Sequence, residues 1–428
     1  MKLTLSTVFL SMLISSSFAA PLTARHRGNR GKKMMSQSTA SGVGAAYFLT
    51  NEPTGNFVVA ASIGNDGKLT LRQATPADGA GAHGLGEPNA APGPDPLFTQ
   101  GAVKASAASN LLATVNAGSN TLSVFNIDPQ NPTNLDMLGQ PIGSGGEFPV
   151  SVAFNKAGDS VCALNAGVVN GVACFKVDKT AGTIAPIAGS VRSLNLNQTT
   201  PATGPAGTPS HVVFSEDNTK LIASVKGIPP TPGFFAVWDV DATTGALSED
   251  FQASQPTAGG LLPFSMTIIP GKNAILATDA GLGLDIFDLD AAAQDGVAAG
   301  RSTTLAIDGQ SATCWSSFSK KTGNFYLTDI GTSLVSEIQL DDNLKPALVK
   351  QYPQGDGVAT IDNDIVSVGD NDFMFVLAAN ATQVKVLALN SPGQASDLQT
   401  LDIAGPAKAA GLAINGVNLQ GMTTFLKQ

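Results

Sequence analysis

The chain has 428 residues, of which 43% are hydrophobic and only 13% are charged, with 46 Gly and 25 Pro. Its formal net charge of −9 argues against a nucleic-acid-binding or anionic-membrane surface, because both need basic patches. Sparse charge together with abundant Gly and Pro favours short strands and many turns over helices.

The N-terminal residues differ from the rest in composition. In residues 1–19 a lysine precedes an uncharged apolar stretch and small residues follow, which predicts a secretory signal peptide and no membrane span. Residues 20–43 predict a basic, flexible leader, which a protease removes as a propeptide or which stays as an arm. Without residues 1–33 the net charge is −15, since 18 of the 24 Lys and Arg and all 33 Asp and Glu remain. We expect an extracellular protein, either free or associated with a cell wall.

From residue 44 onward the chain repeats one hairpin phrase. Two apolar runs flank a small polar turn in LLATVNAGSNTLSVFNID (111–128), VCALNAGVVNGVACFKVD (161–178) and FYLTDIGTSLVSEIQLD (325–341). An apolar residue stands eleven positions before each turn, as Phe154 does before Asn165. Units begin near residues 44, 97, 147, 208, 260, 311 and 358, and a period of about 50 residues is typical of propellers and solenoids.

Each unit predicts four antiparallel strands, because the apolar residues alternate and turn residues separate the runs. One such sheet cannot bury both of its faces, whereas radial stacking of several sheets covers them. The sequence therefore predicts an all-β, seven-bladed β-propeller with four-stranded antiparallel blades, formed as a single domain by residues 44–428. The C-terminal segment GLAINGVNLQGMTTF (411–425) either closes the ring against the first blade or forms a loose tail.

The three cysteines and two sequons fit an oxidising compartment. Cys162 and Cys174 flank a hairpin centred on Val168, so they lie opposite each other on paired strands and predict a disulfide. Cys314 is left over, as a buried or as a reactive thiol. Asn197 and Asn380 begin Asn-x-Thr sequons and are predicted glycosylation sites.

The repeat register nominates residues at one mouth of the central channel, where the innermost strands of a propeller begin. The candidates are Glu147, Ser151, His211, Ser265, Trp315 and Asp364. His211 is the candidate general acid–base, because imidazole titrates near neutral pH. In the alternative interpretation, backbone groups satisfy its hydrogen bonds and it has no catalytic role. For Trp315 there are two interpretations: its ring stacks on a ligand, or it packs in the core. Residues 73–96 and 226–233 depart from the repeat and either wall a pocket or form surface loops.

Two aspartates have a structural interpretation, and the sequence lacks the known motifs for metal, nucleophile and phosphate sites. Asp279 and Asp329 follow the apolar runs at positions where Asp stabilises its own turn. Two body histidines and one spare cysteine do not supply a zinc ligand set, and no calcium loop, nucleophile elbow or phosphate loop is present. We therefore expect no metal and no cofactor.

The segments SVAFNKAGDSVCALNAGVVNGVACFKVD (151–178) and TPSHVVFSEDNTKLIASVKG (208–227), with residues 95–128, resemble a known family. They are similar to the secreted fungal branch of the seven-bladed lactonases, described as 3-carboxymuconate-cyclase-like and related to 6-phosphogluconolactonases. The resemblance spans residues 44–405. It implies metal-independent opening or closing of a lactone ring on a small organic acid.

Two motifs of that family are altered in this chain. The family pattern Pro-His-x-x-x-Phe reads Pro209-Ser210-His211-Val212-Val213-Phe214, with the histidine one residue late. A one-residue shift turns a strand side chain to the opposite face, so the family's catalytic role does not pass to His211. The family's Asp-Leu-Gly-x-Asp turn is approximated by residues 329–333, without the last acid.

Two functions follow from these features. The first is a lactonase or cycloisomerase in which an acid–base residue acts at the channel mouth, while Arg192, Arg301 or Lys226 stabilises a developing carboxylate or enolate. The second is a non-catalytic secreted or wall-associated glycoprotein that uses the propeller as a display and interaction scaffold. Few arginines, the displaced histidine and small neutral channel residues favour the second slightly. We expect a monomer.

Overall fold

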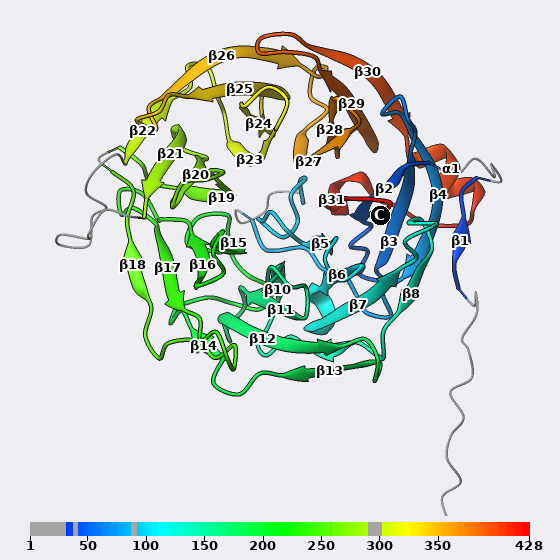
Figure 1. The fold of residues 1–428 in the computed structure, drawn as a ribbon, viewed down its shortest axis with the longest axis horizontal. Helices are drawn as coiled ribbons and strands as arrows, with labels where there is room; N and C mark the ends of the chain where they lie inside the picture. The colour runs from blue at the N-terminus through cyan, green and yellow to red at the C-terminus, as the bar shows by residue number, and fades with distance from the viewer. Residues whose placement is uncertain (1–30, 37–41, 87–91, 258, 290–301) are drawn as a thin grey trace, which may run out of the picture. The chain divides into compact units, whose positions relative to one another are not determined.

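Seven antiparallel sheets form a ring in the computed structural model, as Figure 1 shows. The structure describes residues 31–36, 42–86, 92–257, 259–289 and 302–428, and residues Lys32–Gln428 form one unit. The predicted all-β, seven-bladed propeller with four-stranded antiparallel blades is confirmed. The predicted signal peptide (1–19) and Arg301 lie outside the described residues.

Blades 4 to 7 each contain four strands, which follow one another from the centre of the ring outward. Blade 4 consists of β15 (Pro209–Phe214), β16 (Lys220–Val225), β17 (Phe234–Asp239) and β18 (Gln252–Ser254). Blade 5 consists of β19 (Pro263–Ile268), β20 (Ala274–Asp279), β21 (Gly283–Asp288) and β22 (Thr303–Ala306). Blade 6 consists of β23 (Thr313–Phe318), β24 (Phe325–Asp329), β25 (Leu334–Leu340) and β26 (Pro346–Pro353). Blade 7 consists of β27 (Thr360–Val368), β28 (Asn371–Ala378), β29 (Gln383–Leu389) and β30 (Ala395–Asp402).

Blades 2 and 3 have a fifth, two-residue strand that pairs with the third strand of the same blade. Blade 2 consists of β5 (Val103–Ser106), β6 (Leu111–Asn116), β7 (Thr121–Ile127), β8 (Leu135–Met137) and β9 (Ile142–Gly143). Blade 3 consists of β10 (Pro149–Phe154), β11 (Ser160–Asn165), β12 (Gly171–Asp178), β13 (Thr183–Pro186) and β14 (Arg192–Ser193). Within the described ranges, the helical turns are α1 (Ala404–Ala409), η1 (Ala117–Ser119) and η2 (Gly416–Asn418). Among the described helices, none has the length and apolar character to cross a membrane.

Blade 1 joins the two ends of the chain and closes the ring. Its strands lie in the order β31 (Gln420–Leu426), β2 (Gly44–Leu49), β3 (Phe57–Ile63), β4 (Leu69–Pro76) and β1 (Lys33–Met34). The C-terminal segment therefore supplies the innermost strand, and the unit start near residue 44 marks the second strand of this blade. On the outside, Lys33 and Met34 pair with Ala74 and Gln73, so part of the predicted leader belongs to the blade. The sequence did not indicate that strand.

The second strand of most blades is buried along its whole length. All residues of β6, β11, β20 and β24 are buried, because the blades on either side cover both faces of the sheet. The largest fully buried side chains include Trp238, Trp315 and Tyr47. Burial of each large apolar side chain stabilises the fold by about 1.5–3 kcal/mol, so the radial contacts between blades hold the ring together.

A β-bulge marks the start of the innermost strand in five consecutive blades, 3 to 7. The register shifts lie between Pro149 and Ser151, Pro209 and His211, Pro263 and Met266, Thr313 and Trp315, and Thr360 and Asn363. A bulge adds a residue to one strand and changes the direction in which neighbouring side chains point. Simple alternation along the strand therefore does not place the side chains at this channel mouth.

Candidate functional site

The segment Asp95–Gly101 lies inside the ring of innermost strands, and we call it the plug. In Figure 1 the blue segment that precedes β5 is in the centre of the ring. Ser151 Oγ of blade 3 donates to the Gln100 carbonyl oxygen at 2.8 Å, and Trp315 Nε1 of blade 6 donates to the Thr99 carbonyl oxygen at 2.8 Å. Gln420 Nε2 of β31 donates to the same Thr99 oxygen at 3.0 Å. The plug is thus bound to strands on different sides of the channel.

Conformation and packing both hold the plug in place. Leu97 is 1% exposed and Gln100 is 4% exposed. Phe98 has φ +55°, in the left-handed region that bulky residues avoid. Gly101 has φ +89°, and an added Cβ would lie 2.7 Å from Ser151 Oγ, so any larger residue is strained there. Sequence reasoning missed the plug, although the adjacent large apolar residues Leu97 and Phe98 in a Pro-flanked loop were a signal of burial.

A buried lysine of blade 4 binds the plug. Lys226 Nζ donates to the Phe98 carbonyl oxygen at 2.8 Å and lies 4.5 Å from the centroid of the Phe264 ring, a cation–π distance. Burial lowers the pKa of Lys226 to about 7, while the charge of Asp95 opposes that change. Burial likewise raises the pKa of Asp95 to about 6, while the charge of Lys226 opposes the rise.

Asp362 of β27 is a third buried ionisable group near the plug. It accepts hydrogen bonds from Gly421 N at 2.7 Å and from Gln420 Nε2 at 2.5 Å. Its Oδ1 atom has no hydrogen-bond partner among the described residues. Burial raises the pKa of Asp362 to about 7. Asp95, Lys226 and Asp362, with pKa values displaced toward neutrality, form the charged cluster of the plugged channel mouth.

Two aspartates anchor the loops that enter blades 5 and 6. Asp279 Oδ2 accepts from the backbone N–H groups of Leu261 and Leu262, and its Oδ1 accepts from Gly281 N. Asp329 repeats this arrangement with Ser311, Ala312 and Gly331. These contacts agree with the turn-stabilising interpretation of both residues. Asp285 lies close to Asp279, and burial, strengthened by the Asp279 carboxylate, raises the pKa of Asp285 well above its usual range.

Four of the nominated residues lie around the plug, and all four are buried: Ser151, His211, Ser265 and Trp315. Ser151 and Trp315 bind the plug directly, as described above. Trp315 also packs edge-on against Phe264, with ring centroids 5.2 Å apart. Ser265 Oγ lies 2.8 Å from Thr278 Oγ1 and 2.9 Å from Ser316 Oγ. Ser265 thus contributes to a hydroxyl network between blades 5 and 6.

His211 is held between blades as a neutral imidazole. Its Nδ1 accepts a hydrogen bond from Met266 N at 3.0 Å, and its buried Nε2 has no hydrogen-bond partner among the described residues. Burial, with a smaller effect of the Lys104 charge, lowers the pKa of His211 well below its usual range. The side chain is 2% exposed, so the imidazole is shielded from solvent.

The other nominated residues in the described part of the chain lie away from the plug. Asp364 accepts from the backbone N–H and the hydroxyl of Thr424, and burial raises its pKa. Glu147 is half-buried and accepts a hydrogen bond from Thr200. Arg192 donates to the carbonyl oxygens of Ser248 and Leu247, so it joins the outer part of blade 3 to blade 4. Arg301 lies outside the described part of the chain.

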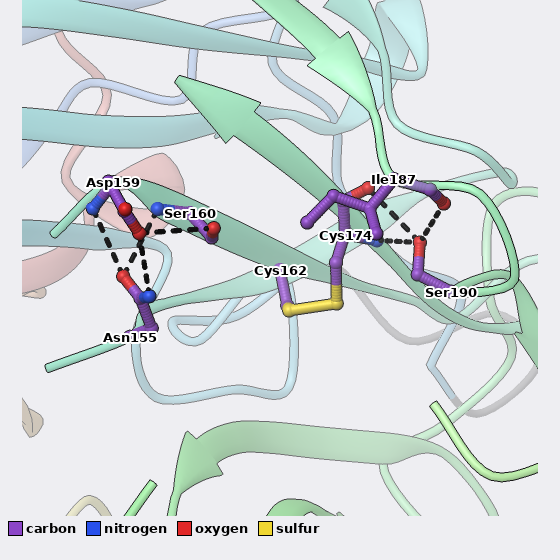
Figure 2. The surroundings of a disulfide bond; sticks show 7 residues. All are labelled: Asn155, Asp159, Ser160, Cys162, Cys174, Ile187 and Ser190. Carbon is purple, nitrogen blue, oxygen red and sulfur yellow. Dashed lines mark hydrogen bonds between the residues drawn. A yellow bond between two sulfur atoms is a disulfide. The ribbon is translucent and has the colours of Figure 1, made fainter. Parts of the chain in front are cut away.

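The predicted disulfide between Cys162 and Cys174 is confirmed, and Figure 2 shows its surroundings. The two residues are direct partners on β11 and β12. Ser190 covers this part of β12, because its Oγ accepts from Cys174 N and donates to the Cys174 carbonyl oxygen. Cys314 is buried, and burial raises the pKa of its thiol well above the usual range, as an unreactive thiol requires.

Asn197 and Asn380 are exposed. Among the described residues, no group of three or more His, Cys, Asp or Glu side chains has the arrangement of a metal site.

Comparison with known proteins agrees with this fold. A family model described as lactonase, 7-bladed beta-propeller, matches residues 39–195, which is less than half of the chain. A search of curated proteins found no match. The periplasmic gluconolactonase of Pseudomonas aeruginosa is 17% identical, with 84% of this chain and 96% of that chain covered and a TM-score of 0.57.

Two further solved structures are similar to the same extent. A putative 6-phosphogluconolactonase from Bacteroides fragilis is 13% identical, with 91% of this chain and 100% of that chain covered and a TM-score of 0.57. A second one, from Bacteroides uniformis, is 16% identical, with coverage of 84% and 97% and a TM-score of 0.57. At such identities the likeness concerns the fold. The chain thus has the fold of lactonase-like seven-bladed propellers, and over residues 39–195 its sequence is similar to that family.

Proposed function

We propose that this protein is a secreted, monomeric and non-catalytic propeller with a lactonase-like fold, which serves as a stable display and interaction scaffold. The observation that carries this proposal is the plug. Ser151 and Trp315, two of the side chains expected to meet a substrate at the channel mouth, bind the chain's own segment Asp95–Gly101 instead.

Displacing the plug costs more free energy than weak binding of a small substrate returns. Each of its hydrogen bonds to the innermost strands contributes about 0.5–1.5 kcal/mol net. Burial of Leu97 and Phe98 adds about 1.5–3 kcal/mol for each side chain. Since a millimolar ligand binds with about 4 kcal/mol, the plugged state is favoured.

Extracellular location is supported by three separate features. The Cys162–Cys174 disulfide suits an oxidising compartment. Asn197 and Asn380 are exposed, so both sequons are accessible to glycosylation. The apolar N-terminal segment has the composition of a secretory signal. Association with a cell wall is part of this proposal, with the glycans and the outer strands as the contact surface.

The test is an activity assay on protein secreted from a eukaryotic host. Purified protein is incubated with glucono-1,5-lactone, 6-phosphogluconolactone and muconolactones, and we expect no turnover above buffer. Light scattering should give the mass of one chain, and mass spectrometry should find glycans on Asn197 and Asn380. Lactone turnover that disappears in Lys226→Met but persists in Lys408→Met would overturn the non-catalytic function.

One observation favours a second function, a lactonase or 3-carboxymuconate-cyclase-like enzyme. Lys226 and Asp362 each have a pKa of about 7, and such displaced values are common among catalytic acids and bases. In this function the plug moves aside, Lys226 stabilises the carboxylate or enolate of a small organic acid, and Asp362 transfers a proton. The same lactone panel separates the two functions, because only the enzyme gives turnover that depends on Lys226.

A further inference from the structure

A cavity of about 350 Å³ lies at the end of the innermost strands that is opposite the plug. The plug bonds to Ser151 and Val152 of β10 and to Ser210 of β15, whereas the cavity is lined by residues from Val152 and Val212 onward and by the turns that follow. Apolar side chains from three blades form its wall: Val152, Phe154, Val213, Phe214 and Ile268. Small-molecule sites are concave and mostly apolar in this way, with volumes from about 300 Å³ upward.

Two lysines supply the charge of this cavity. Lys104 is half-buried on β5, and Lys156 is exposed on the turn after β10. Among the described residues, neither ammonium group has an ion-pair partner within 4 Å. The Lys104 charge acts on the carboxyl groups of Asp362 and Asp364, but Asp364 already accepts hydrogen bonds from Thr424.

The two acidic residues between the lining residues Ser215 and Asn218 are also engaged. Glu216 accepts from Gly271 N, and Asp217 accepts from the Ser215 hydroxyl and from Thr219 N. The cavity therefore combines an apolar wall with two cationic groups that can each bind an anion. Arginine, which binds phosphate or two carboxylates by paired hydrogen bonds, is not among the lining residues, so a single carboxylate fits better.

We propose that this lysine cavity binds an amphipathic monocarboxylate, an aromatic or branched aliphatic acid. The apolar body packs on Phe154, Phe214 and Ile268, and the carboxylate accepts hydrogen bonds from Lys104 and Lys156. No residue of the plug lines the cavity and binding needs no reaction, so the site is independent of the proposed scaffold function.

Binding of 2-naphthoate to the full chain, followed by its fluorescence and by calorimetry, tests this proposal. We expect saturable one-site binding, with a roughly tenfold higher Kd for the neutral analogue 2-naphthalenemethanol, because it lacks the charged hydrogen bonds. Lys104→Gln should raise the naphthoate Kd by roughly tenfold or more, and Lys156→Gln by less, because an exposed charge is screened. Lys408→Gln, on helix α1, is the matched control and should leave the Kd unchanged.

A steric variant tests the cavity itself. Ala105→Phe places a ring in the lined space and should abolish binding, while Ala185→Phe on the exposed face of β13 should not. Thermal unfolding of each variant shows whether it is folded. If Ala105→Phe does not fold, the Lys104→Gln measurement still decides the question. No binding by the wild-type chain, or equal binding by Lys104→Gln, would overturn the lysine cavity as a site. Neither result depends on lactone turnover, so the scaffold function is judged separately.

Discussion

The Lys226 ammonium group donates a hydrogen bond to the Phe98 carbonyl oxygen, 2.8 Å away and 128 positions earlier in the chain. This contact joins blade 4 to the plug in a place that excludes water, since both residues are buried. A charged hydrogen bond of this kind is strong because few solvent dipoles compete with it. Lys226 therefore holds the plug as much as it adds charge to the channel.

Replacement of Lys226 by Met should destabilise the protein. The change leaves the Phe98 oxygen without this donor and Asp95 without the nearby positive charge, so we expect a loss of about 3 kcal/mol in the free energy of unfolding. Urea unfolding followed by tryptophan fluorescence measures it, with exposed Lys408→Met as control. A loss equal to that of the control would show that Lys226 does not hold the plug.

Asp362→Asn should change how stability depends on pH. Burial raises the folded pKa of Asp362 from 3.8 to about 7, so between these values the folded state binds more protons than the unfolded state. The contribution of Asp362 to stability is therefore full below pH 4 and is lost as pH rises toward 7. The amide does not titrate, so Asp362→Asn should gain roughly 3 kcal/mol relative to wild type over this window.

Urea unfolding of both proteins at half-unit steps from pH 4 to 8 measures the Asp362 effect. Asp397→Asn, on an exposed part of β30, is the control and should run parallel to wild type. If the Asp362→Asn curve also runs parallel, the carboxyl group does not hold a proton in the folded state at these pH values.

Gly101→Ala should destabilise the plug by crowding and by backbone strain. The new Cβ would lie 2.7 Å from Ser151 Oγ and 3.0 Å from His211 Cδ2, at φ +89°. Gly357→Ala is a matched control, because Gly357 has φ +66° and nothing within 4 Å of an added Cβ. Strain at such a φ costs about 1–3 kcal/mol in both variants, and crowding adds to it only at Gly101. Equal losses in the two variants would mean that the plug moves to accommodate the methyl group.

His211 should not titrate near neutral pH. Burial lowers its pKa well below the usual range, and Nδ1 accepts from Met266 N, which requires an unprotonated ring nitrogen. In nitrogen-15 NMR spectra of histidine-labelled protein, the His211 resonances should stay those of neutral imidazole from pH 8 down to pH 6. A titration centred near 6.5 would contradict this prediction. It would show that His211 contacts solvent and can act as an acid–base.

Local pattern was enough to predict the ring of blades. The alternation of apolar residues and the regular spacing of turns can both be recognised from residues close together in the sequence. Together they specify the hairpins that make up each sheet. The same reasoning placed Cys162 opposite Cys174, because the register of a hairpin follows from its turn. Sequence alone left the C-terminal segment undecided between ring closure and a tail, since pairing of β31 with β2 joins the two ends of the chain.

The candidate site depended on what the ring brings together. Bulges at the start of the innermost strands turn side chains away from the directions that strict alternation predicts, so His211 lies between blades. The plug takes the place that a substrate was expected to occupy. Sequence therefore determined the hairpins of the sheets and the disulfide, because each is encoded by contacts within one hairpin or one repeat. Only the tertiary structure decided that Asp95, Lys226 and Asp362 lie near one another and that the mouth is filled. Those contacts join residues 51 or more positions apart, and the pattern within one hairpin carries no sign of them.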